Sequence, residues 1–278
     1  MTIWHPVDDP NSDLTSHDTF SSGVPYNTFA RLRTEDPIHW TNYKEGKGFW
    51  SITRHNDIST MIGNTKVFTS GQGIRMEDQT HAEYMARRTF QETDGFEHRN
   101  SRMKVAKAFS GPVIMKFEET ICSLCSDILD NTLPMINFDA TKQIARELPM
   151  RMLGRILGLP EEDLPWLVEK GDALIANTDP DFTNHVLDEL NTNEFRMMPH
   201  NSPAGAELYE YAKTLMERKL EAGDTNGILH MIMQPAKDGS KITETEFKNF
   251  FCQLVAAGND TTRYSIAAGI HALCHQPE

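Results

Sequence analysis

An acidic residue and a hydroxyl residue, Asp260 and Thr261, stand side by side in the run AGNDTT at 257–262. A carboxyl group can deliver a proton during a reaction, and a neighbouring hydroxyl can hydrogen-bond a small ligand or a water. Gly258 precedes the pair, and a residue without a side chain lets another group approach the backbone closely. Two interpretations are open. The run either lines a groove for a small ligand, or Gly258 admits a crossing helix while Asp260 and Thr261 face solvent or a buried water.

His98 and Arg102 form a second candidate pair. They lie in a basic stretch with Arg99, Lys104 and Lys107 that contains no Asp or Glu, although the chain carries a formal net charge of -13. Residues four apart share one face of a helix, so the two side chains could clamp one anion through charge-assisted hydrogen bonds. The alternative is a solvated helix face.

The cysteines do not complete a metal site. Cys122 and Cys125 form a CxxC, but no second CxxC or nearby pair of histidines accompanies them, so packing within a helix is the expected role. Four cysteines fit a reducing cytosol. The acidic charge argues against nucleic acid and anionic membrane surfaces as partners, and no apolar run is long enough to cross a bilayer. We therefore expect a soluble, cytoplasmic protein without a structural metal.

The AGNDTT run lies within a long predicted helix, Thr243 to Gln276. Thr243 and Glu246 have the spacing of a capping box, which marks the start of a helix. Residues at three- and four-residue steps then share one face, which we expect to be buried: Phe247, Phe250, Leu254, Gly258, Thr261, Ser265 and Gly269. At roughly 1.5 Å per residue the helix would extend about 50 Å, enough to cross a domain. The weak helix formers at 258–262 cost about 2 to 3 kcal/mol, which suggests a site.

The other elements are predicted from shorter signals. Strands are expected at 38–43 and 48–54, joined by a hairpin turn at 44–47, and helices at 26–34, 55–63, 97–109 and 204–222. Thr80 and Glu83 form a second capping box, which predicts a helix to Phe90. Gly158 and Pro160 should stop another helix. The polar segment from Thr178 to Pro203 is either a substrate lid or a plain linker.

In this order, the segments resemble the cytochrome P-450 superfamily of haem-thiolate monooxygenases. AGNDTT in a long, late helix resembles the oxygen-activating helix of the family, EHRNSR at 97–102 resembles the segment that holds the haem propionates, and LGLPEED at 157–163 resembles a further family segment. Gly95 and Phe96 depart from the family, because many members have two prolines there. The resemblance implies a mainly α fold with a small N-terminal β-region, haem b as cofactor, and hydroxylation of an apolar small molecule with O2 and two electrons.

The resemblance also assigns roles on the long helix. Asp260 would relay protons, Thr261 would hydrogen-bond the bound oxygen, and Gly258 would make room over the haem. Ala257 and Thr262 would border the cofactor.

On the basic helix, the resemblance implies that His98 and Arg102 hold the haem propionates. The electrons would come from a ferredoxin or a flavodoxin, and the stretch from Arg99 to Lys107 would suit an acidic donor.

The family's axial iron ligand is a Cys thiolate. It comes late in the family sequence, in a glycine-flanked loop after a Glu-x-x-Arg helix, and neither pattern occurs here. We therefore expect residues 1–278 to be the N-terminal portion of a single cytochrome P-450 domain, with the axial Cys outside the chain, and to be inactive alone. We also expect the long helix of such a portion to expose Phe247, Phe250, Phe251 and Leu254 and to make it poorly soluble.

Two rival classes are open. Asn259 and Asp260 resemble the start of the N-D-x-x-S-x-x-x-E motif of Mg-dependent terpenoid cyclases, but Arg263 and Ala267 stand where that motif needs a hydroxyl and a carboxylate. A non-catalytic helical binding or interaction protein would keep the fold without the chemistry. The sequence does not select a substrate, because terpenoid, steroid, fatty and aromatic compounds all suit apolar pockets.

Overall fold

The computed structural model describes residues 9–43, 46–76, 78–176, 179, 193–236 and 239–276. Within these ranges most elements are helices, and the sheet found there has two strands. The chain divides into two compact parts, Met1–His81 with Gln91–Gly95, and Ala82–Phe90 with Phe96–Glu278. The expected single domain over 1–278 stays a prediction. The mainly α fold with a small N-terminal β-region is confirmed.

The first part carries the sheet. It contains α1 (His17–Ser21), α2 (Tyr26–Glu35), β1 (Ile38–Thr41), β2 (Phe49–Ile52) and α3 (His55–Gly63). The strands pair antiparallel with Trp40 opposite Trp50, and these two rings pack edge to face with centroids 5.1 Å apart. The predicted hairpin and its flanking helices are confirmed. Residues 44 and 45 of the predicted turn lie outside the described residues.

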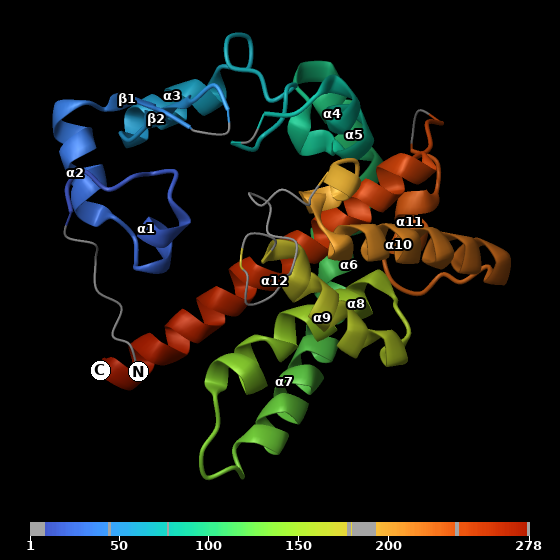
Figure 1. Ribbon diagram of the computed structural model, residues 1–278. Coiled ribbons are helices and arrows are strands. Elements are labelled where there is room, and N and C mark those ends of the chain that lie inside the picture. Colours follow the sequence, from blue (N-terminus) through green and yellow to red (C-terminus); the bar gives the residue numbers. More distant parts are fainter. Residues whose placement is uncertain are drawn as a thin grey trace. The chain divides into compact units, whose positions relative to one another are not determined.

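The second part is helical. Figure 1 shows α12 crossing this part, and α8, α9 and α10 pack against it. A π-helical turn, Thr141–Ala145, precedes α8. The helices are α4 (His81–Arg87), α5 (Gly95–Ala106), α6 (Gly111–Ile114), α7 (Glu118–Thr132), α8 (Glu147–Leu157), α9 (Leu164–Ile175), α10 (Pro203–Ala222), α11 (Leu229–Met233) and α12 (Glu244–His275). Among the described residues, no helix is both long and apolar enough to cross a membrane.

The start of α12 follows the predicted capping box. The backbone N–H of Glu246 donates to the Thr243 hydroxyl at 3.2 Å, and the Thr243 N–H donates to the Glu246 carboxylate at 2.8 Å. The Glu246 carboxylate also accepts two hydrogen bonds from Lys104 of α5, at 2.8 and 3.1 Å. The cap therefore fixes both the beginning of α12 and its contact with α5.

The first half of α12 is buried by this chain's own helices, so the expected exposure of its aromatic residues is wrong. Phe247 is 1% exposed, Phe250 6% and Phe251 0%, and Leu254 is partly buried. The reason is local packing, since Phe250 meets Phe90 and Phe109, and Tyr211 of α10 meets Phe251. The expected buried face also ends early, because Thr261, Ser265 and Gly269 are exposed.

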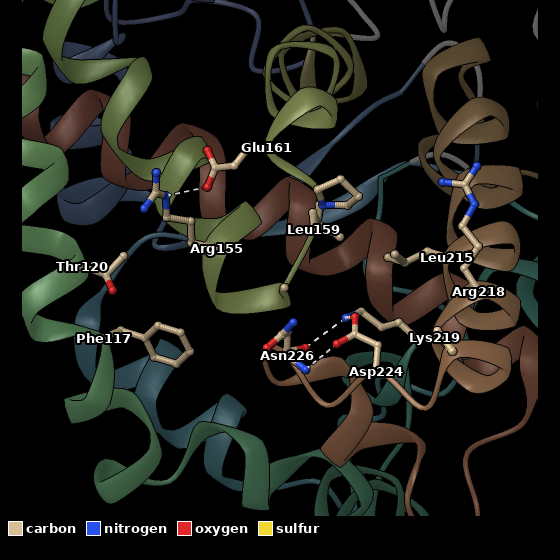
Figure 2. Close-up of a pocket in the computed structure, with 13 residues that line it drawn as sticks. Phe117, Thr120, Arg155, Leu159, Glu161, Leu215, Arg218, Lys219, Asp224 and Asn226 are labelled. Carbon is tan, nitrogen blue, oxygen red and sulfur yellow. Dashed lines mark hydrogen bonds and ion pairs between the residues drawn. The ribbon is translucent and has the colours of Figure 1, made fainter.

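The end of α8 packs closely against the loop that follows α10. Gly158 caps α8 at φ 74°, and a Cβ there would lie 2.3 Å from the carbonyl oxygen of Asn226. Lys219, whose side chain is 3% exposed, donates to Asp224 at 2.7 Å and to the Asn226 carbonyl at 3.0 Å. Figure 2 shows these bonds at the edge of a cavity of about 490 Å³. The predicted stop at Gly158 is confirmed, and the absence of a side chain there also makes room for the neighbouring loop.

The helix predicted from the capping box at Thr80 and Glu83 was expected to reach Phe90. It is shorter, because α4 ends at Arg87. The Glu83 side chain, 9% exposed, forms an ion pair with Arg196, a contact between distant segments that sequence spacing does not reveal. More than half of the segment from Thr178 to Pro203, predicted as a lid or linker, lies outside the described residues, at 178 and 180–192.

Candidate functional site

The AGNDTT run lies where α12 packs against α8 and α9. Gly258 faces α8, since a Cβ there would lie 2.9 Å from a methyl carbon of Leu153. The Thr261 hydroxyl donates to the Ala257 carbonyl at 3.1 Å, and the side chains of Ala257, Thr261 and Thr262 are exposed. The run therefore has a packed side at Gly258 and an open side at Thr261. Gly258 does admit a neighbouring helix, as the packing interpretation expects, and the groove for a small ligand stays a prediction.

Asn259 is the buried member of the run, and sequence reasoning missed its role. It is 0% exposed, and its amide nitrogen donates to a carboxylate oxygen of Asp172 on α9 at 2.9 Å. Its own amide oxygen has no hydrogen-bond partner among the described residues. Asp172 follows Leu164 and Val168 at four-residue steps, on the apolar face of the helix, and this was the available signal, because a buried carboxylate needs partners.

Asp172 is the centre of a charged network. It accepts a hydrogen bond from Arg263 of α12 at 2.6 Å and another from Arg146, which precedes α8, at 2.6 Å. The second nitrogen of the Arg263 guanidinium is ion-paired with Asp260. The side chains of Asp172, Arg263 and Asp260 are 9%, 13% and 17% exposed. The predicted acid of the site therefore shares one arginine with a second carboxylate.

The surroundings of Asp260 change its acidity. Burial raises the pKa of Asp260 above its usual range, the positive charge of Arg263 lowers it, and the negative charge of Asp172 raises it, with a raised pKa as the net result. A carboxyl group that holds its proton to higher pH is better suited to donate it near neutrality.

On α5, the structure places His98 and Arg102 in different surroundings. The Nδ1–H of His98 donates to the Phe90 carbonyl at 2.7 Å, and the two rings pack edge to face at 5.7 Å. This bond fixes the ring and leaves Nε2 for a ligand. Arg102 is exposed and forms no hydrogen bond or ion pair within the described part of the chain.

These two residues fit an anionic group such as a cofactor carboxylate. The guanidinium of Arg102 has no bonding partner among the described residues and could donate to an anion. The ring of His98 is already oriented by its hydrogen bond to the backbone. Lys104 of the basic stretch serves a different purpose, since it is bonded to Glu246. Among the described residues, no group of three or more His, Cys, Asp and Glu side chains could hold a metal ion. The four cysteines are free, with Cys252 buried.

A long helix that carries AGNDTT, a basic helix with an exposed arginine, and a small N-terminal sheet are the features that the sequence resemblance to the cytochrome P450 class implies. Comparison with known proteins supports this class. No family model matches the chain. The chain is 26% identical over 291 residues to a steroid C26-monooxygenase of Mycobacterium tuberculosis, covering 100% of the chain and 63% of that protein. It is 27% identical over 262 residues to a methyl-branched lipid omega-hydroxylase of the same species, covering 90% and 58%.

Solved structures agree. A Mycobacterium marinum cytochrome P450 in complex with pseudoionone matches with a TM-score of 0.80 and 26% identity, covering 100% of this chain and 66% of that one. The chain has the cytochrome P450 fold, and haem iron is the cofactor that this likeness implies. It spans about 63% of the length of the first curated relatives that it matches.

Proposed function

We propose that the protein is a haem-dependent monooxygenase that hydroxylates an apolar small molecule with O2 and two electrons. The observation that carries the proposal is the open side of α12, where the exposed Thr261 stands beside Asp260, an acid with a raised pKa. The names of the curated relatives, a monooxygenase and a hydroxylase, support the same reaction type.

The residues divide into binding and proton-transfer roles. His98 and Arg102 would hold the haem carboxylates, and Ala257, Gly258 and Thr262 would border the ring. When bound, the haem iron supplies the oxygen-activating chemistry.

Thr261 would hold a water by its hydroxyl. Asp260, with 17% of its side chain exposed, would pass a proton from solvent to that water and be reprotonated from outside.

The substrate and the electron donor follow from different observations. The relatives act, by their names, on a steroid and a methyl-branched lipid, so an apolar compound of steroid or lipid class is proposed. Arg99, Arg102 and Lys107 on and just after α5 are exposed cations in an acidic chain, which favours an acidic ferredoxin or flavodoxin as the donor. Such a protein would work in the cytoplasm.

The test is product formed per reduced cofactor consumed in the haem-loaded protein. Thr261→Ala should still bind substrate and accept electrons but divert oxygen to peroxide. Asp260→Asn should slow turnover about a hundredfold, the size of a general-acid contribution. Ser265→Ala, which removes an exposed hydroxyl one turn further along α12, is the matched control and should form as much product per reduced cofactor as the wild type does. If Thr261→Ala and Asp260→Asn both form as much product per reduced cofactor as the wild type, the proposed proton-transfer roles are wrong.

A further inference from the structure

Asp260 is connected to a different helix through one arginine. Arg263 lies one turn after Asp260 on α12, and its two terminal nitrogens reach two different carboxylates, Asp260 on α12 and Asp172 on α9. The bond to Asp172 is 2.6 Å long, and all three side chains are at most 17% exposed. A guanidinium in this position is a bridge rather than a simple ion pair.

The charges around Asp260 nearly balance. Arg263 is the cation that contacts it, Asp172 is the second anion on Arg263, and Arg146 approaches Asp172 from the other side. Glu147 lies 3.8 Å from Arg146 and at the edge of the group. Two arginines therefore serve Asp172 and Asp260 together, and each carboxylate receives only part of the charge of Arg263.

We propose that Arg263 and Asp172 are positioning residues for Asp260: Arg263 holds the Asp260 carboxyl group, and Asp172 competes with Asp260 for Arg263. The role of the positioned acid rests on the proposed monooxygenase function, but the competition itself does not. Because Asp172 lies on α9, any displacement of α9 away from α12 would leave Arg263 to Asp260 alone. The carboxyl group would then be fully paired and would release its proton more readily.

The competition can be measured in the 278-residue chain without haem. Aspartate carboxyl carbons are labelled with carbon-13, the Asp260 signal is assigned by its loss in Asp260→Asn, and its titration is followed by NMR. Asp172→Asn should lower the pKa of Asp260, increasing its acid dissociation constant about tenfold. Arg263→Gln should raise it. In the Arg263→Gln background, Asp172→Asn should have much less effect, because the bridge through which it acts is gone.

Two controls and one fallback variant decide the result. Glu147→Gln removes a carboxylate whose ion-pair partner among the described residues is Arg146, and it should leave the titration of Asp260 unchanged. Arg263→Lys keeps the charge but cannot span both carboxylates, so the effect of Asp172→Asn should also shrink there. If Asp172→Asn does not fold, Arg263→Gln still tests the proposal, because an unchanged Asp260 titration in that variant would overturn it.

If Asp172→Asn changes the pKa of Asp260 equally with and without Arg263, the proposal that Arg263 transmits the effect is wrong. The two carboxylates would then act on each other directly. In the haem-loaded protein, the pH profile of product per reduced cofactor should shift in the same direction as the NMR titration. Asp260→Asn could form as much product per reduced cofactor as the wild type while the NMR titration of Asp260 still depends on Asp172 and Arg263. In that case the proton-delivery function is wrong and the positioning of Asp260 by the bridge stands.

Discussion

Replacing Asp172 with Asn should lower the free energy of unfolding of the helical part by about 3 kcal/mol. Removing one partner of a buried ion pair costs roughly 3 to 5 kcal/mol, because the remaining charge is left uncompensated. Asp172 is 9% exposed and accepts hydrogen bonds from two arginines. The lower end of the range applies, since Arg263 keeps Asp260 and Arg146 is 35% exposed with Glu147 nearby.

The assay is thermal unfolding of the 278-residue chain followed by circular dichroism. At roughly 2 to 4 °C per kcal/mol for a part of this size, Asp172→Asn should lower Tm by about 6 to 12 °C. Glu147→Gln, which removes a more exposed carboxylate at 3.8 Å from the same Arg146, should cost less than about 1 kcal/mol. A loss for Asp172→Asn no larger than that of Glu147→Gln would refute the assignment of stability to the network.

Asp260→Asn should behave differently in the same assay. The folded state raises the pKa of Asp260, so it binds the proton more tightly than the unfolded state does. The contribution of Asp260 to stability is then present at low pH and is lost as pH rises through the raised pKa, so at neutral pH the charged carboxylate opposes folding. Asp260→Asn removes that cost and should be destabilised less at pH 7 than Asp172→Asn. An equal loss in the two variants would contradict the raised pKa.

The remaining predictions concern three other positions. Arg102→Ala should weaken haem binding about tenfold to a hundredfold, the worth of a charge-assisted bond, and unchanged haem retention would contradict the carboxylate role. Burial raises the pKa of Cys252 to about 12, so at pH 8 an alkylating reagent should modify the exposed Cys122 and Cys274 and spare Cys252 until denaturant is added, as read by mass spectrometry. Gly258→Val should cost about 1 to 3 kcal/mol by crowding Leu153, and an unaltered urea midpoint would show that the contact relaxes freely.

Local signals in the sequence predicted the local structure well. The capping box at Thr243 and Glu246 marked the beginning of α12, and the strand predicted at 48–54 contains β2. The predicted helix at 55–63 matches α3, and the Gly158 stop matches the end of α8. Each of these features depends on neighbours within a few residues, which the sequence displays directly.

Contacts between distant segments could not be predicted in the same way. Asn259 and Asp172 are 87 residues apart in the chain, so nothing in the AGNDTT spacing indicates that its Asn is the buried residue. The same limitation applies to Glu83, whose capping role was predicted from spacing although Arg196 is its ion-pair partner. The candidate residues Asp260, Thr261, His98 and Arg102 were found from their types and the family resemblance. Asp172, whose carboxylate is the second one bonded to Arg263, was not found in this way.

Burial along α12 ends at the candidate site. Asn259 is the last buried residue of the helix, and the side chains from 260 to 275 are partly or fully exposed. A helical segment without tertiary packing opens locally at little free-energy cost. Amide hydrogen exchange should therefore be slow up to Asn259 and become progressively faster beyond Arg263. Asp260 and Thr261 lie on that boundary, so a ligand that packs on the open side of α12 would order the helix beyond them, and part of its binding energy would offset the entropy of that ordering.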